Sequence, residues 1–289
     1  MGQIKIVRCI GGLGNQMFQY AFYKSLESSY PHVKFDVSPF NNYNTHNGFE
    51  LDRIFPINYY SPSFREKISL SFQSGGFIFR LLKHTYKKKR AKEYYEDGLY
   101  FHEDALLNGG NLYYIGYWQS WKYFQRIKKI IKGDFRFDET QLPPSNLEIL
   151  SKIRNTNSIS LHIRRGDYLG NPIYANITTP DYYNNAIDYI KKNVKDPFYF
   201  IFTNDPEWCK VNMMLPNSLI VDINSGVDSY WDMFLMSQCK HNIIANSSFS
   251  WWGAWLNEHE NKIVIAPRKW INEDSANIDD IIPPTWKRI

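Results

Sequence analysis

The segment IKIVRCIGGLGNQMFQYAFYKSLESSYPHVKFDV, residues 4–37, contains the pattern that decides the fold. Residues 4–10 favour a strand, residues 11–16 form a glycine loop, and residues 17–30 space their apolar side chains as a helix does. Residues 32–37 then favour a second strand. Because strands that alternate with helices pair in parallel through right-handed crossovers, this segment predicts the start of a parallel α/β sheet.

The same alternation returns more clearly in the second half of the chain. We expect strands at 158–163, 198–203, 219–223, 241–246 and 262–267, and helices at 180–194, 229–239 and 248–258. The double proline in DETQLPPSN, residues 138–146, indicates a linker. The sequence therefore predicts two α/β domains, residues 1–145 and 146–289, and a chain of 289 residues has room for about two domains.

Composition points to a globular protein, because 43% of the residues are hydrophobic and 22% are charged. The three cysteines, Cys9, Cys209 and Cys239, lack metal-type spacing, which predicts free, buried thiols in a reducing compartment. The first residues read as a strand rather than a signal peptide, and no apolar run approaches the roughly 20 residues of a membrane span. We therefore expect a cytoplasmic protein.

A formal net charge of +5 and two basic stretches, residues 83–92 and 120–135, favour an anionic partner. In the second stretch, apolar residues recur at helical spacing between lysines and arginines. This pattern fits a solvated face beside a core-facing stripe, and it also fits peripheral contact with the anionic inner face of a membrane. No nucleic-acid motif accompanies the charge, so we do not expect nucleic acid as a partner.

Polar residues follow several predicted strands of the second half. In SLHIRRGDY, residues 160–168, Arg164 and Arg165 come directly after an apolar run. Arginine is rarely buried unless its guanidinium group pairs with an anion such as a carboxylate or a phosphate. Ligands of open α/β sheets bind at the carboxyl ends of the strands, so these ends indicate one crevice. The polar strand ends contain His162, Arg164, Arg165 and Asp167, then Thr203, Asn204 and Asp205, then Asp222, and finally Asn246, Ser247 and Ser248.

Two turns, the serine pair at 247–248 and the glycine loop at 11–16, help to indicate which anion the protein binds. Ser247 and Ser248 begin a predicted helix, where they can cap it or, beside the double arginine, hold a diphosphate. The glycine loop fails the dinucleotide fingerprint because Met17 stands where a small residue is needed. The chain also has no GxxxxGK[ST], HExxH, GxSxG or DxD sequence, which disfavours kinase-type loops, zinc proteases, esterases and metal-held nucleotides.

Taken together, GGLGNQMFQYA (11–21), HIRRGDY (162–168), FTNDP (202–206) and NSSFSWWGAWL (246–256) resemble the bacterial α-1,2-fucosyltransferases of glycosyltransferase family 11. The resemblance spans nearly the whole chain. It implies a GT-B-like fold of two Rossmann-like domains, with GDP-fucose bound by the C-terminal half and the acceptor mostly by the N-terminal half. The implied reaction is inverting, metal-independent transfer of L-fucose from GDP-β-L-fucose to the 2-hydroxyl of a terminal galactose, in an oligosaccharide or surface glycan, without a cofactor.

The resemblance also implies roles for individual residues. Arg164 would neutralise the β-phosphate, while Arg165 would assist it or pair with Asp167. The donor would further contact His162, Asn204, Asp222, Ser247 and Ser248. Asn15 would approach the leaving oxygen or the acceptor, in a loop that also contains Gly12, Gly14 and Gln16. For the general base, Asp167 and Asp36 both stay open.

Other readings of the sequence stay open as well. Another GDP-fucose-dependent transferase, forming an α-1,6 or protein-linked product, would carry the same donor motifs. A noncatalytic module that binds nucleotide sugars or a membrane surface would keep Arg164 and the serines but show no turnover. A nicotinamide-dependent oxidoreductase is disfavoured by Met17.

Overall fold

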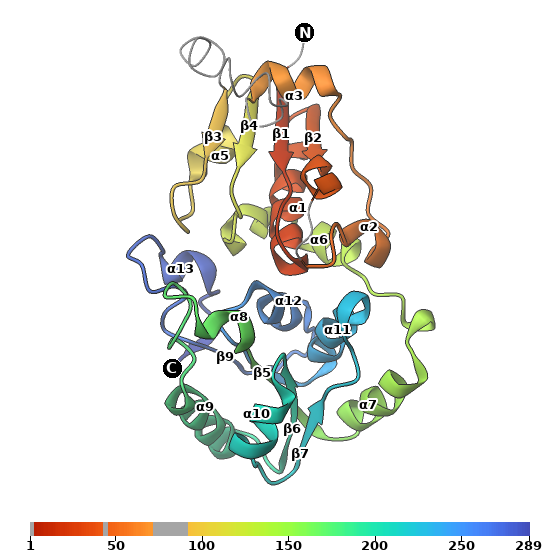
Figure 1. The fold of residues 1–289 in the computed structure, drawn as a ribbon, viewed down its shortest axis with the longest axis vertical. Coiled ribbons are helices and arrows are strands. Elements are labelled where there is room, and N and C mark those ends of the chain that lie inside the picture. Colours follow the sequence, from red (N-terminus) through yellow and green to blue (C-terminus); the bar gives the residue numbers. More distant parts are fainter. Residues whose placement is uncertain (1–2, 43–45, 72–91) are drawn as a thin grey trace. The chain divides into compact units, whose positions relative to one another are not determined.

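The structure, a computed structural model, describes residues 3–42, 46–71 and 92–289. The chain divides into two compact units, Met1–Arg136 and Phe137–Ile289, each built on a parallel sheet (Figure 1). The division falls before the predicted boundary at residue 145. The reason is that the predicted linker belongs to the second unit: Leu142 is buried in its core, and Pro144 begins a helix.

The first unit has a four-stranded sheet in the order β2-β1-β4-β3, in which all strands are parallel. Its strands are β1 (Ile4–Arg8), β2 (His32–Asp36), β3 (Glu93–Tyr95) and β4 (Leu112–Ile115). The helix α1 (Leu13–Glu27) connects β1 to β2, as the sequence predicts. The shorter helical segments are η1 (Ser38–Asn42), α2 (Leu51–Ile54), α3 (Phe64–Leu70), α5 (Glu103–Leu107), η2 (Trp121–Ile127) and α6 (Lys128–Asp134).

The second unit has a six-stranded parallel sheet in the order β10-β9-β8-β5-β6-β7. Its strands are β5 (Asn157–Ile163), β6 (Pro197–Thr203), β7 (Ser218–Val221), β8 (His241–Ile243), β9 (Val264–Ala266) and β10 (Lys287–Arg288). Its principal helices are α7 (Pro144–Arg154), α9 (Pro180–Asn193), α10 (Pro206–Asn212), α11 (Tyr230–Gln238) and α12 (Ser248–Leu256). Shorter helical segments are η3 (Glu139–Gln141), α8 (Gly166–Leu169), η4 (Gly226–Asp228) and α13 (Ile278–Ile281). Each predicted strand and helix of this half is present, with shifted ends.

Helices cover both faces of the second sheet. On one face, Ile159 and Leu161 of β5 and Ile201 of β6 pack with α9 and α10. On the other face, Phe200 and Phe202 pack with α7 and α11. Because side chains alternate along a strand, β6 must be apolar at nearly every position, which explains its continuous apolar sequence.

The helix α12 packs closely on α11 through Gly253. A Cβ atom at this position would lie 2.9 Å from the Met236 Cβ atom, so only glycine fits without movement. The flanking Trp251, Trp252 and Trp255 are buried, and they are core residues rather than an exposed sugar-binding surface.

The second basic stretch, residues 120–135, forms η2 and α6 rather than one helix. Phe124 and Ile131 are buried, while Arg126, Lys128 and Lys129 are exposed, so the apolar stripe faces the core. Most of the first basic stretch, residues 83–91, lies outside the described residues. Among the helices in the described ranges, none has the length and apolar character that crossing a bilayer requires. All three cysteines are free and buried, as predicted.

Candidate active site

The second unit contains a cavity of about 390 Å³ at the carboxyl ends of β5, β6 and β7. The parallel register brings these ends together, because His162 lies opposite Phe202 and Ile163 opposite Thr203. This is the edge at which open α/β sheets bind their ligands. Five residues of the predicted polar strand ends line the cavity: His162, Arg164, Thr203, Asn204 and Asp222.

Arg164 supplies positive charge to this cavity. It directly follows β5, so the end of a buried strand sets its backbone position. Its half-buried guanidinium carbon lies 5.5 Å from the ring centroid of Tyr168, whose hydroxyl donates to the carbonyl of Asn246 (3.1 Å). The cavity therefore contains a guanidinium group with planar N–H donors, which matches phosphate oxygens.

His162 is a neutral imidazole in the same cavity. Its side chain belongs to a residue that is only 5% exposed, and burial together with the charge of Arg164 lowers its pKa to about 3. Its Nδ1 atom is buried and has no hydrogen-bond partner among the described residues. Its ring lies beside that of Phe249, at 6.2 Å between centroids. A polar atom that is buried without a partner costs free energy, so Nδ1 is suited to meet a ligand here.

Arg165 is held by the protein itself. Its Nε atom donates to the Asp205 carboxylate at 3.2 Å, and its guanidinium lies 3.8 Å from the Trp208 ring centroid. Its backbone N–H donates to Asn204 Oδ1 at 2.9 Å. Asn204 also lies so close to Gly166 that a Cβ atom there would come within 2.4 Å of it. Arg165 and Asn204 thus shape the turn that presents Arg164.

Asp232 is a cavity residue that sequence reasoning missed. It lies in α11, lines the cavity, and accepts a hydrogen bond from Asn224 Nδ2 at 2.7 Å. Asn224 is oriented in turn by a reciprocal pair of amide hydrogen bonds with Asn146, at 2.8 and 2.9 Å. Burial raises the pKa of Asp232 to about 7. One signal could have found it, since an acidic residue stands alone in the otherwise apolar helix YWDMFLMSQ.

The remaining predicted residues of this half lie around the cavity. Asp222 is exposed at its edge. Ser247 is the N-cap residue of α12, but its side chain makes no capping hydrogen bond. Phe249 of α12 lines the cavity, whereas Ser247 and Ser248 do not. The side chain of Asp167 lies outside the described residues. Nowhere in the described part of the chain do three or more His, Cys, Asp or Glu side chains group to hold a metal ion.

The glycine loop of the first unit is held by its own side chains. Gln16 Nε2 donates to the carbonyls of Gly11 and Gly48, at 2.9 and 2.8 Å, while its Oε1 accepts from the Glu50 N–H. Asn15 Oδ1 accepts from Gln119 Nε2 at 2.7 Å. Gly11 has a φ of 85°, which favours glycine. Gly12 is the extended N-cap residue, so α1 begins at Leu13 rather than at residue 17.

The N-terminus of α1 is already satisfied by an internal carboxylate. Glu50 directly precedes α2 and lies at the N-terminus of α1. Its carboxylate accepts a hydrogen bond from the backbone N–H of Leu13, and the residue is only 2% exposed. Its carboxylate also accepts from Arg53 and Asn47, both at 3.2 Å. An anion at a helix N-terminus is the arrangement that a bound phosphate would otherwise provide. The first unit therefore does not offer α1 to a diphosphate, and the second unit holds the candidate donor site.

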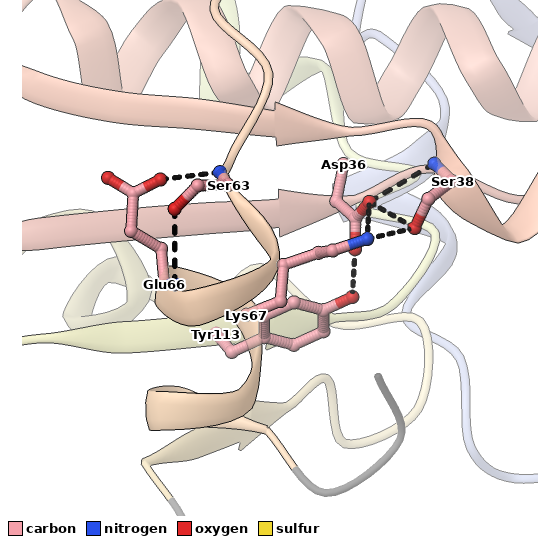
Figure 2. Close-up of polar contacts among 6 residues, drawn as sticks. All are labelled: Asp36, Ser38, Ser63, Glu66, Lys67 and Tyr113. Carbon is pink, nitrogen blue, oxygen red and sulfur yellow. Dashed lines mark hydrogen bonds and ion pairs between the residues drawn. The ribbon is translucent and has the colours of Figure 1, made fainter. Parts of the chain in front are cut away.

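Asp36 acts as a structural anchor of the first unit, and Figure 2 shows its contacts. Its carboxylate accepts from the Tyr113 hydroxyl at 2.7 Å and the Ser38 hydroxyl at 2.6 Å, and Lys67 Nζ lies 3.5 Å away. Lys67 projects from α3, whose first turn is closed by the capping box of Ser63 and Glu66. This network ties α3 and β4 to the end of β2, which gives Asp36 a structural role, and its role as a general base stays a prediction.

Solved structures and curated sequences extend this description. The crystal structure of NodZ α-1,6-fucosyltransferase co-crystallised with GDP is similar, with a TM-score of 0.52 and 14% identity over 88% of this chain and 92% of that chain. This likeness concerns the fold alone, and it confirms the predicted GT-B-like α/β class.

Two curated relatives differ in how much of the chain they match. An α-1,2-colitosyltransferase of Escherichia coli is 37% identical over 296 aligned positions, which cover 99% of both chains. Galactoside α-(1,2)-fucosyltransferase 1 of Rattus norvegicus is 28% identical over 47% of this chain and 39% of its own length. The family model described as glycosyl transferase family 11 matches residues 3–289. With its motifs, its fold and its full-length relative in agreement, this chain is a member of glycosyl transferase family 11.

Proposed function

We propose that this glycosyltransferase transfers L-fucose from GDP-β-L-fucose, with inversion and without a metal, to the 2-hydroxyl of a terminal galactose. The single observation that carries the donor half of this proposal is the cavity at the ends of β5, β6 and β7. It combines one guanidinium group, one neutral imidazole and the half-buried carboxyl group of Asp232 around a volume of about 390 Å³.

These three groups suit the parts of a guanosine diphosphate. Arg164 offers paired N–H donors to the β-phosphate, and it would stabilise the charge that develops as the diphosphate leaves. The Asp232 carboxylate can accept from the N1–H and 2-amino groups that guanine presents on one edge. Neutral His162 would meet a phosphate or ribose group through Nδ1 without adding a second positive charge. Asn204 and Asp222 lie at the rim, within the same cavity.

The linkage and the sugars rest on the relatives. Both curated relatives carry α-1,2 in their names, one with colitose and the other with fucose and a galactoside. A colitosyl donor is therefore a second candidate, because the relative matched over the full chain is a colitosyltransferase. Fucose and colitose differ by one hydroxyl, so a donor site with a hydrogen-bonding group at that position would discriminate strongly between them.

The test measures GDP release from GDP-fucose, with and without lactose, in EDTA. We expect lactose-dependent release by the wild type and a loss of about a hundredfold or more in Arg164→Ala, in line with the removal of one electrostatic contact to a leaving group. Lys210→Ala is the matched control, because Lys210 is exposed on α10 and pairs with Glu207.

Each outcome separates one reading from another. Preference for GDP-colitose under the same conditions would favour the second donor. A product in which fucose is linked to a primary 6-hydroxyl, in place of the 2-hydroxyl of galactose, would favour α-1,6 transfer. GDP binding without release for any acceptor would favour a noncatalytic module, and full activity of Arg164→Ala would contradict the assigned role of that arginine.

A further inference from the structure

A half-buried carboxyl group, that of Glu96, lies at the carboxyl edge of the first sheet. It directly follows β3, and its backbone N–H donates to the Ile115 carbonyl of β4 at 2.9 Å. Its carboxylate accepts two backbone donors, the N–H of Tyr117 at 2.6 Å and the N–H of Trp118 at 3.0 Å. Within the described ranges, no lysine, arginine or histidine side chain pairs with it.

The segment that Glu96 holds, residues 116–119, has an unusual backbone. Trp118 is fully buried and has a φ of 57°, a left-handed conformation that is rare for a bulky residue. At Gly116, a Cβ atom would lie 2.5 Å from the Glu96 Cβ atom, so glycine is required. Strained backbone of this kind tends to occur at functional sites.

The same segment reaches the glycine loop. Gln119 Nε2 donates to Asn15 Oδ1 at 2.7 Å, so a hydrogen bond joins the loop after β4 to the first turn of α1. Tyr117 is 38% exposed and presents an aromatic ring, a side chain that suits the apolar face of a sugar. Because all four strands are parallel, Glu96, Tyr117 and Asn15 share the edge at which such sheets bind ligands.

Glu96 differs from the other buried carboxylates at this edge. Asp36 pairs with Lys67, and Glu50 pairs with Arg53 and satisfies the start of α1. These cations and helix donors hold both groups in structural roles. For Glu96, burial outweighs the two backbone hydrogen bonds and raises the pKa to about 7. A general base works best when its pKa lies near the working pH.

Two titratable side chains interact electrostatically with Glu96, Tyr94 of β3 and Tyr123 of η2. Burial raises the pKa of each tyrosine well above its usual value. Asp104 accepts the hydroxyl hydrogen of Tyr94 at 2.7 Å. Both tyrosines therefore stay neutral at neutral pH, and they leave Glu96 as the proton acceptor of this cluster.

We propose that Glu96 takes the proton from the acceptor hydroxyl, and that the edge formed by Glu96, Tyr117 and Asn15 receives the acceptor sugar. This inference rests on the proposed function. The O–H bond of the acceptor breaks as its oxygen bonds to the anomeric carbon of the donor. The bond from that carbon to the diphosphate oxygen breaks, its electron pair leaves with GDP, and the proton passes to the Glu96 carboxylate and then to solvent.

The test compares Glu96→Gln with Glu96→Asp, and uses Glu93→Gln as the matched control on the same strand. In the wild type we expect kcat/KM for the acceptor to fall on the acid side of a pKa near 7. Glu96→Gln should lose this acid limb and lower kcat by about 10²–10⁴-fold, the usual contribution of a general base. Glu96→Asp should keep the limb with reduced kcat, and Glu93→Gln should match the wild type.

A role limited to holding the 116–119 segment predicts a different result. In that case Glu96→Gln would keep the acid limb, and its melting temperature would fall together with its activity, which would overturn the assignment. GDP affinity of the same variant should equal that of the wild type, because the donor cavity lies in the second unit. If the wild type transfers to no acceptor, the proposed function fails and this inference falls with it; an active wild type with an unchanged Glu96→Gln profile overturns only the inference.

Discussion

Asp232 changes charge in the pH range of ordinary assays, because burial raises its pKa to about 7. In the proposed function, its ionised form would accept from the N1–H and 2-amino groups of guanine, whereas its protonated form would lose one of these acceptors. GDP affinity should therefore fall as the pH drops below 7. Asp232→Asn should remove this pH dependence and weaken binding at pH 8 by roughly 10–100-fold, the value of a hydrogen bond to a charged group.

Titration calorimetry with GDP between pH 6 and pH 8.5 measures both effects. Inosine diphosphate, which lacks the 2-amino group, provides the control on the ligand side: it should bind the wild type less tightly than GDP does, and the difference should shrink in Asp232→Asn. An Asp232→Asn protein with the wild-type pH profile would place the titrating group elsewhere in the cavity.

Single residues also mark the limit of sequence reasoning. The sequence predicted that His162, Arg164, Asn204 and Asp222 lie close together, because each stands at the carboxyl end of a predicted strand and parallel strands end at one edge. Asp232 and its partner Asn224 could not be predicted in this way. Asp232 lies inside a helix and reaches the cavity only through the packing of α11 against the sheet. Arg165 pairs with Asp205, a contact between two loops that spacing alone does not reveal.

At the scale of elements, the close contact of α11 and α12 depends on Gly253. The methyl group of Gly253→Ala would lie 2.9 Å from the Met236 Cβ atom and 3.3 Å from its sulfur atom. Overpacking of this kind costs about 1–3 kcal/mol. We expect Gly253→Ala to lower the free energy of unfolding by about that amount, as measured by urea denaturation.

Gly133 provides the matched control for this substitution. It also lies in a helix, α6, and a Cβ atom there would meet nothing within 4 Å. Gly133→Ala should therefore follow helix propensity alone and stabilise the protein by up to about 1 kcal/mol. Equal effects of the two alanines would mean that α11 and α12 adjust without cost.

Elements of the first unit were harder to predict than those of the second. The strands β3 and β4 are only three and four residues long, and tyrosine dominates their sequences. They therefore lack the alternation of apolar and polar residues from which a strand is predicted. The stretch 120–135 has helical spacing, yet it forms η2 followed by α6 because its buried residues, Tyr123, Phe124 and Ile131, must pack on α1 and its surroundings. Tertiary packing overrides local spacing here.

At the scale of the whole molecule, we expect ionised Asp232 in the candidate donor cavity to lower the free energy of unfolding above pH 7. The pKa of Asp232 is raised from 3.8 to about 7, so the folded state favours its neutral form. Below pH 4, protonated Asp232 contributes fully to the free energy of unfolding. This contribution is lost as the pH rises through 7, because the folded protein then holds a carboxylate that is poorly solvated. Asp232→Asn should therefore raise the melting temperature at pH 8 and leave it nearly unchanged at pH 4.

Thermal unfolding of both proteins at these two pH values checks the sign. His162 acts in the opposite direction, because its lowered pKa reduces stability as the pH falls below 6.5, but it is present in both proteins and cancels in the difference. A variant that is more stable and binds GDP less tightly would show that this site exchanges stability for function. A lower melting temperature at pH 8 would contradict the burial cost assigned to Asp232.

The sequence by itself determined the family, the parallel α/β class and the strand ends that carry most of the candidate donor site. It could do so because motifs, apolar strands and polar strand ends are local patterns, read within about ten residues. The tertiary structure alone decided three other things. It decided that Asp36 is an anchor, that Glu50 fills the start of α1, and that Asp232 and Glu96 are half-buried carboxyl groups with raised pKa values. Burial, partner and pKa depend on contacts between residues far apart in the chain, and no local pattern encodes them.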